Sequence, residues 1–226
     1  MKRFVGLDPS TKTGFVAMNE QGNVLRQKDL QGVGNVDPKR MESLIQEIMD
    51  HIQPEDVVCI ESPAMGAQGQ GVGFMWGLAY GIRGALFRRG IKFHDVAPTA
   101  LKKFCDASRH RFDADGKKLD GKAAVAQGVY EHWGYSHSSN NVIDAYVLAQ
   151  IAYALTLNDY ELMAGDYKAY QYEVVKTVLK PAADKKAEKA AANKKKKEKA
   201  AAKAVSELTG KKPRTRSQKP ADAVLF

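Results

Sequence analysis

Two short apolar runs in this chain end in the same way, at a carboxylate with a proline close behind. Residues 4–7 stop at Asp8-Pro9, and residues 57–60 stop at Glu61-Ser62-Pro63. Runs of this length and composition predict buried strands. An acid that ends a buried strand lies at the carboxyl edge of the sheet, where open α/β folds place their functional sites. The chain is therefore expected to carry a polar site at one edge of a buried sheet.

The two strand ends predict a metal site if the strands are parallel neighbours. Their last residues would then lie about 4.8 Å apart. Carboxylates at that distance repel one another unless a cation lies between them. Hard cations with oxygen ligands fit such a site, so we expect Mg²⁺, with Mn²⁺ as the alternative.

A helix predicted over residues 139–157 brings a third acid, Asp144. Asn141 and Asp144 are three residues apart, so both project from one face of the helix near its first turn. Asp144 alone could do no more than complement the positive end of the helix dipole. Each acid taken alone is more often structural than catalytic, but three acids on two strand ends and a helix start favour catalysis.

The rest of the first 157 residues predicts one α/β domain, because short apolar runs alternate with helical periods. Further strands are expected at residues 14–18, 24–30 and 91–93, and helices at 41–49, 73–88, 98–106 and 119–133. The helix at 73–88 carries a stripe of small residues that lets another helix approach closely, namely Gly73, Gly77, Gly81 and Gly84. One more helix, packing on this body, is predicted over residues 158–179.

Residues 180–226 form a basic, low-complexity tail, with 15 Lys and Arg against 5 Asp and Glu. The whole chain has a net charge of +9, so all of the positive surplus lies in this tail. We expect the tail to be disordered or a solvated helix, since it has no apolar face to bury. Its lysine block would neutralise nucleic-acid phosphates without reading sequence, and the alternative is a solubilising extension. The block consists of Lys194, Lys195, Lys196 and Lys197.

Three further features bear on partners and compartment. The final residues Val224, Leu225 and Phe226 look somewhat like the short hydrophobic peptides that dock on sliding clamps. Cys59 and Cys105 fall in a predicted strand and helix, so no disulfide framework is expected and a reducing cytoplasm is the natural setting. The longest apolar helix candidate is interrupted by a charge and is too short to span a bilayer. We therefore expect a cytoplasmic protein with no membrane partner.

Several segments resemble those of RuvC Holliday-junction resolvases, a family of the RNase H-like superfamily. Residues 6–14, GLDPSTKTG, resemble the first-strand motif of the family. Ile60-Glu61 resembles its fourth-strand glutamate, and residues 141–145, NVIDA, resemble its C-terminal acidic helix. Residues 98–102, PTALK, and 121–125, GKAAV, look like its two lysine-bearing segments. The resemblance covers roughly residues 1–157 and keeps the order of the motifs.

The resemblance implies an RNase H-like mixed central sheet flanked by helices, and a two-metal phosphodiesterase. Asp8 would ligate both metal ions, and Glu61 and Asp144 would complete the coordination of these ions. Lys122 would offset the charge of the phosphate in the transition state. Lys102 would contact the DNA backbone, although a solvated helix face is an equally good interpretation of this lysine.

The resemblance also implies how the chain would act. The family cleaves Holliday junctions as a homodimer, in DNA recombination and repair, and the helix at 73–88 is a candidate for the dimer contact. The family suggests a bacterial cell or a phage-infected host as the setting.

The chain departs from the family at Asn141, where the family has an acid or, in some branches, a histidine. An amide oxygen can still coordinate a hard cation, but the lost charge would weaken metal binding or favour Mn²⁺. Alternatively, Asn141 is only a helix-start residue that follows Ser138 and Ser139.

A second departure follows Glu61, where bacterial resolvases place an aromatic residue that stacks on a base. This chain has residues 62–65, SPAM, and its nearest aromatic residues, Phe74 and Trp76, are expected in the core. Two alternatives to a resolvase therefore stay open. One is a related nuclease that acts on RNA or flap DNA, and the other is a structure-selective DNA-binding protein with weak catalysis.

Overall fold

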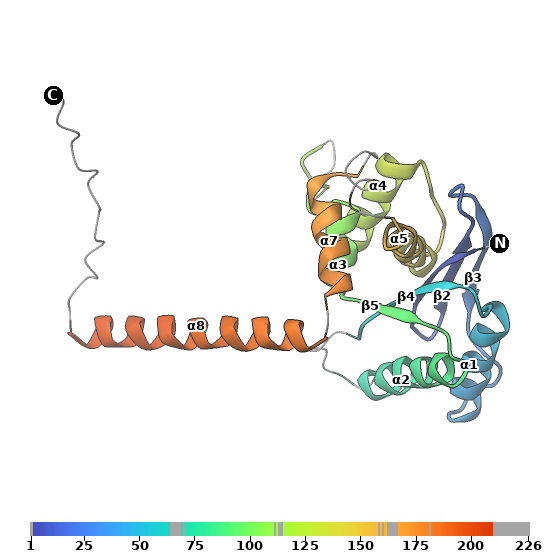
Figure 1. The fold of residues 1–226 in the computed structure, drawn as a ribbon, viewed down its shortest axis with the longest axis horizontal. Helices are drawn as coiled ribbons and strands as arrows, with labels where there is room; N and C mark the ends of the chain where they lie inside the picture. Colours follow the sequence, from blue (N-terminus) through green and yellow to red (C-terminus); the bar gives the residue numbers. More distant parts are fainter. Residues whose placement is uncertain are drawn as a thin grey trace. The chain divides into compact units, whose positions relative to one another are not determined.

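A central sheet of five strands organises the body of the protein (Figure 1). The computed structural model describes residues 2–63, 69, 71–110, 112, 115–157, 159, 161, 167–180 and 182–209. The strand order is β3-β2-β1-β4-β5, with β1 paired antiparallel to β2 and parallel to β4. The strands are β1 Phe4–Asp8, β2 Thr13–Met18, β3 Val24–Leu30, β4 Val57–Glu61 and β5 Phe93–Val96. The two predicted strands that end in acids are thus parallel neighbours.

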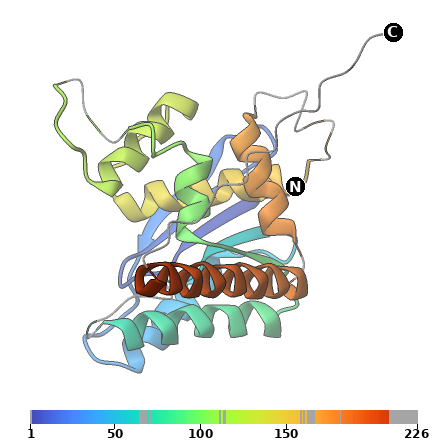
Figure 2. The same ribbon diagram turned by 90° about the vertical axis from the view of Figure 1, so that its left-hand side faces the viewer.

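Helices cover both faces of the sheet, so the central strands are buried on both sides. Figures 1 and 2 show α1 (Lys39–His51) and α2 (Val72–Arg88) below the sheet. Above it lie α3 Pro98–Phe104, α4 Gly121–Trp133, α5 Asn140–Ala154 and α7 Ala169–Leu179. Consecutive side chains of a strand point to opposite faces, so Phe4 joins the upper core while Val5 joins the lower one.

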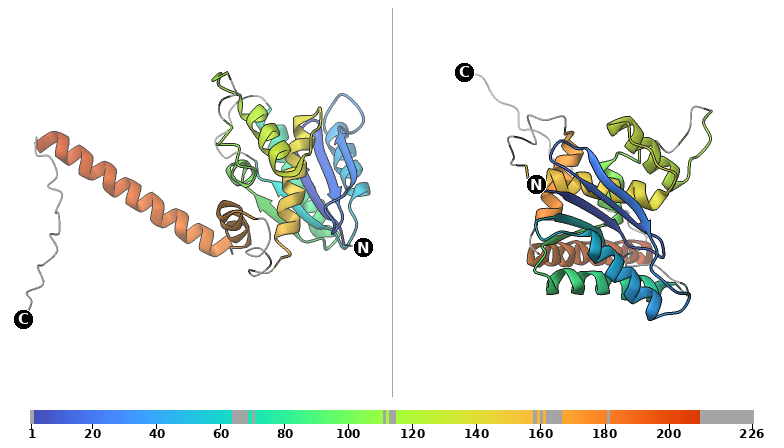
Figure 3. Two further views of the ribbon diagram at one scale, coloured as in Figure 1. Left: turned by 90° about the horizontal axis from the view of Figure 1, so that it is seen from above. Right: turned by 90° about the vertical axis from the view of Figure 1, so that its right-hand side faces the viewer.

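Helix α5 lies directly on the main chain of β1 and β2, and Figure 3 shows it alongside these strands. Two glycines make this approach possible. A Cβ atom on Gly6 would lie 1.9 Å from the carbonyl oxygen of Ala145, and one on Gly14 would lie 1.9 Å from that of Asn141. No other residue fits at either position without moving the helix. The first turns of α5 are therefore held against β2 and against β1, the strand that ends at Asp8.

Two glycines of the stripe on α2, Gly77 and Gly81, serve a contact within the chain. A Cβ on Gly77 would lie 3.2 Å from Met41 Cε, and one on Gly81 would lie 2.5 Å from Ile45 Cδ1, both on α1. The helix that the stripe admits is therefore α1. The outer face of α2 carries two exposed aromatic side chains instead, Tyr80 and Phe87.

The helices appear in the predicted order, but α7 covers only Ala169–Leu179 of the helix predicted over residues 158–179, and the fifth strand begins later than predicted. The apolar signal at Ile91 belongs to the end of α2, because the Ile91 amide donates to the carbonyl of Leu86 (3.0 Å). Gly90 takes up the left-handed conformation, with a φ of 68°, that commonly ends a helix. The strand itself starts at Phe93 and runs to Val96.

The chain divides into two compact units, Met1–Leu179 and Lys180–Phe226. Within the second unit, Ala182–Thr209 form helix α8, on which Lys194, Lys195, Lys196 and Lys197 are all exposed. Val224, Leu225 and Phe226 lie outside the described residues. Among the residues that the structure describes, no helix is both long and apolar enough to cross a membrane.

Candidate active site

Asp8 and Glu61 lie side by side at the carboxyl ends of β1 and β4. The preceding residues, Leu7 and Ile60, are paired in the parallel register, so the two acids end adjacent strands at the same level. Asp8 is almost fully buried, with 8% of its surface exposed. Both acids line a cavity of about 210 Å³, together with Pro9, Ser10, Ser62, Pro63, Met75, Ala79 and Pro98.

The environment of Asp8 holds its pKa well above the usual value of a carboxyl group. Burial is the largest cause, followed by a side-chain hydrogen bond with Glu61 and by the charges of Glu61 and Asp144. The ammonium group of Lys122 acts in the opposite direction. A hydrogen bond between two carboxyl groups needs a proton between them, so this pair occupies a position that a cation could take.

Asp144 is the third acid of the site, on the first turns of α5. Burial, and then the charge of Glu61, raises the pKa of Asp144 to about 7, while Lys122 and Lys102 lower it. Electrostatic interactions connect five of the predicted site residues, namely Asp8, Glu61, Asp144, Lys122 and Lys102.

The two lysines come from the helices above the sheet. Lys122 lies in the first turn of α4, where Asp120 caps the helix by accepting from the amides of Lys122 (2.9 Å) and Ala123 (2.7 Å). Lys102 lies in α3, with its Nζ 3.9 Å from where a Cβ on Gly121 would be. Both side chains are exposed, so both ammonium groups are accessible to an anion.

The acids fit a site for hard cations by their chemistry. They are alike in charge, Asp8 is buried, and the neighbouring carboxylates help to raise the pKa of Asp8 and of Asp144, which a bound divalent cation would reverse. Among the described residues, however, no three acidic, histidine or cysteine side chains converge closely enough to hold one ion between them. Asp8 and Glu61 share a side-chain hydrogen bond, whereas Asp144 interacts with both through its charge.

Asn141 contacts the loop that follows Asp8. Its amide nitrogen Nδ2 donates to the carbonyl oxygen of Lys12 (2.6 Å) and to Ser10 Oγ (3.1 Å). It is not the cap of α5, because Ser139 takes that position and its hydroxyl accepts from the Val142 amide (3.5 Å).

Arg83 is a residue of the site that the sequence analysis missed. It projects from α2, and only 13% of its side chain is exposed. It donates to the carbonyl oxygens of Ala79 (2.8 Å) and Glu61 (3.2 Å), and its Nε lies 2.9 Å from Asp95 Oδ1. Arg83 thereby ties α2 to the ends of β4 and β5. The available signal was a lone charge in the apolar part of α2, where a buried arginine needs partners.

Phe74 and Trp76, the two aromatic residues expected in the core, have different surroundings. Phe74 packs against the lower core, and the guanidinium of Arg40 lies 4.7 Å from the centre of its ring. Trp76 is partly buried and stacks on the exposed Tyr80, with ring centres 5.8 Å apart.

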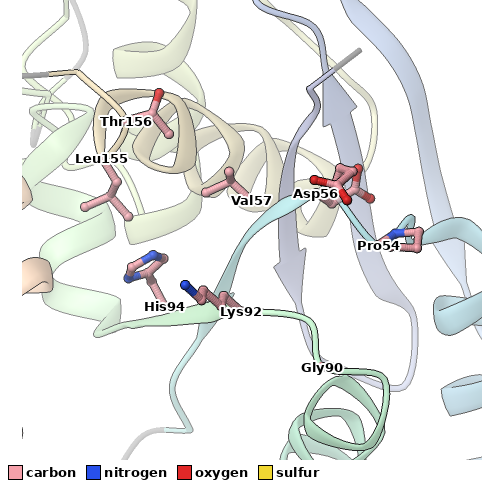
Figure 4. A pocket seen from close by; sticks show the side chains of 9 residues that line it. Pro54, Asp56, Val57, Gly90, Lys92, His94, Leu155 and Thr156 are labelled. Carbon is pink, nitrogen blue, oxygen red and sulfur yellow. The ribbon is translucent and has the colours of Figure 1, made fainter.

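A larger hollow, of about 390 Å³, lies at the opposite edge of the sheet (Figure 4). It is lined where β4 and β5 begin and where α5 ends, by residues that include Asp56, Val57, Lys92, His94 and Thr156. It is therefore remote from the carboxyl ends that carry Asp8 and Glu61.

The strand order, the antiparallel β2 and the placement of α5 define an RNase H-like fold, which confirms the predicted fold class. The chain is similar to a solved structure of RuvC from Thermus thermophilus, with 16% identity and a TM-score of 0.49 over 71% of this chain and 95% of that one. A T. thermophilus RuvC in complex with a Holliday junction substrate matches with 17% identity and a TM-score of 0.48, over 66% of this chain and 93% of that one. No protein-family model and no curated protein matches the chain.

Proposed function

We propose that this protein is a metal-dependent nuclease that hydrolyses phosphodiester bonds in branched DNA, with Holliday junctions as its substrate. The observation that carries the proposal is the contact of Asp8 with Glu61 at adjacent strand ends, with Asp144 in electrostatic reach of both. A buried acid with a raised pKa that lines a cavity, as Asp8 does, is typical of functional sites. The order of the resembling motifs along the chain supports the same proposal.

Different side chains of the protein would have different roles in hydrolysis. Asp8, Glu61 and Asp144 would hold divalent cations, Mg²⁺ or Mn²⁺, which when bound supply an activated water and stabilise the leaving oxygen. Lys122, near Asp8 and Asp144, would offset the charge of the scissile phosphate. Lys102 would contact a phosphate of the DNA backbone.

A homodimer is part of the proposal, because two symmetric cuts in a four-way junction need two active sites. The outer face of α2 offers the contact surface, with Tyr80 64% exposed and Phe87 81% exposed. Sedimentation of the wild-type protein and of a Tyr80→Glu, Phe87→Glu variant measures this directly. A dimer that the double substitution leaves intact would place the contact elsewhere.

In this proposal the tail strengthens the binding of DNA. Lys194, Lys195, Lys196 and Lys197 are exposed on α8 and are available to phosphates. A contact of Val224, Leu225 and Phe226 with a sliding clamp stays a prediction.

The decisive experiment incubates the protein with a four-way DNA junction and Mg²⁺ or Mn²⁺. Paired, symmetric nicks are expected, and Asp8→Asn should abolish them while sparing junction binding. Cleavage of linear RNA or of DNA flaps, but not of junctions, would favour the related nuclease. Junction binding without cleavage in either metal would favour the structure-selective binding protein.

A further inference from the structure

We propose that Asn141 is a positioning residue whose amide nitrogen latches the loop after Asp8 onto the start of α5. The inference rests on the proposed function only in that Asp8 is taken as a metal ligand. The loop comprises residues 9–12 and connects β1 to β2. Asn141 lies in the first turn of α5, 129 residues further along the chain than Lys12.

The orientation of the Asn141 amide is fixed by its partner. Nδ2 lies 2.6 Å from the carbonyl oxygen of Lys12, which can only accept a hydrogen bond. The group facing it must therefore be the nitrogen of the amide and not its oxygen. A nitrogen that donates in this way cannot coordinate a cation, so this contact does work other than metal binding.

The latched loop is itself closed by hydrogen bonds. Ser10 Oγ donates to the Lys12 carbonyl (2.7 Å) and accepts from the Lys12 amide (3.1 Å). The hydroxyl of Thr13, which is fully buried, donates to the carbonyl of Ser10 (2.9 Å). Asn141 Nδ2 adds a second donor to Ser10 Oγ at 3.1 Å. The loop therefore has one closed shape, and Asn141 attaches that shape to α5.

The latch links two of the proposed metal ligands. Asp8 comes directly before the loop, and Asp144 lies three residues after Asn141 on the same helix face. On the other side of the loop, Gly14 admits the carbonyl of Asn141 against β2. The hydrogen bond from Asn141 to the Lys12 carbonyl therefore fixes the end of β1 relative to the start of α5. This contact in turn sets the position of Asp8 relative to Asp144.

The latch explains why this chain has an amide where resembling proteins have an acid. A carboxylate at position 141 would keep the oxygen but lose the donor, and it would place a negative charge against the Lys12 carbonyl. The carboxylates of Asp8, Glu61 and Asp144 would then supply the charge of the metal site without a fourth acid.

The test compares Asn141→Ala, Asn141→Asp and the matched control Asn140→Ala in the full-length protein without metal or DNA. Asn140 is the neighbouring residue of α5 and its side chain is exposed. Hydrogen exchange of the amides of residues 12–14 should become about tenfold faster in both Asn141 variants, the size expected for one lost hydrogen bond. Asn140→Ala should exchange like the wild-type protein, and Ser10→Ala should reproduce part of the effect.

Two results would overturn the latch. One is exchange of residues 12–14 that stays at the wild-type rate in Asn141→Ala and Asn141→Asp. In that case a Mn²⁺ titration in which only Asn141→Asp binds more tightly would assign the residue to the metal through its oxygen. The other is equal loosening of all of α5 in the Asn140 and Asn141 variants, which would reflect the helix start alone. Because the exchange is measured without metal or DNA, it does not depend on whether the protein cleaves junctions.

Discussion

The guanidinium of Arg83 donates to the main-chain carbonyl of Glu61 over 3.2 Å, so a helix below the sheet holds the strand end that carries a proposed metal ligand. The same guanidinium pairs with Asp95 at the end of β5. Glu61 is thereby located by its backbone, while its carboxyl group stays available to the cavity. α2 also carries the surface proposed for the dimer, so the proposed dimer contact and the candidate active site share one helix.

Replacing Arg83 should impair cleavage more than it impairs folding. Arg83→Met removes the donor to Glu61, and loss of a group that orients a metal ligand typically lowers activity by about 10- to 100-fold. The cost to the free energy of unfolding should be only about 1 kcal/mol, because Asp95 is half exposed and solvent screens the ion pair. Junction cleavage rates and urea unfolding measure the two effects. Arg88→Met, on the exposed last turn of the same helix, is the control, and equal losses of activity in both variants would contradict the role of Arg83.

The metal-free protein should become less stable as pH rises from acid to neutral. The pKa of Asp144 is raised from 3.8 to about 7 in the folded protein, mainly by burial, so the folded state holds a proton that the unfolded chain releases. The stabilisation is complete below the lower pKa and is lost as pH passes the higher one. A pKa difference of this size corresponds to roughly 4 kcal/mol, and Asp8 acts in the same direction.

Urea unfolding at about pH 4 and about pH 8 measures this slope. Asp144→Asn should flatten it, whereas Glu20→Gln on the exposed turn between β2 and β3 should leave it unchanged. Addition of Mg²⁺ at the higher pH should restore stability, since cations favour the charged carboxylates. A stability that rises with pH in the metal-free wild-type protein would refute the electrostatic account of the site.

Alanine at Gly6 should destabilise the protein strongly. The added Cβ would meet the Ala145 carbonyl at 1.9 Å, and main chain cannot move aside as a flexible side chain can. We expect a loss of about 3 kcal/mol or more, at the upper end of the usual cost of overpacking. Gly73→Ala is the matched control, because a Cβ there meets nothing within 4 Å and alanine favours a helix. Similar unfolding midpoints for the two variants would show that α5 can shift away from β1.

Truncation after Leu179 should weaken DNA binding and flatten its dependence on salt. The deleted residues carry the positive surplus of the chain, and a protein that forms fewer ion pairs with phosphates releases fewer counterions when it binds. Binding titrations at several salt concentrations measure the slope. Replacing Lys194, Lys195, Lys196 and Lys197 by glutamine in the full-length chain should give part of the same effect at unchanged length. Unchanged affinity after truncation would leave the tail as a solubilising extension.

The sequence predicted the features that have a local cause. Asp8 and Glu61 could be placed because each directly follows an apolar run, and Asp144 because it interrupts the apolar start of a helix. The predicted start of β5 was wrong because Ile91, an apolar residue bonded to the end of α2, looks the same in sequence as an apolar residue that begins a strand. The partners of Asn141 and Arg83 lie 129 and 22 residues away from them, so no local pattern could indicate these bonds.

The contact of α5 with Gly6 and Gly14 has a consequence for how this protein can change. Because the helix rests on main chain, the separation of Asp8 from Asp144 depends on backbone geometry and not on the size of intervening side chains. The surrounding helices can then diverge, lengthen or be exchanged while the separation is kept. Four short segments, namely the end of β1, the start of β2, the end of β4 and the first turns of α5, form a unit that protein design could transplant into another scaffold.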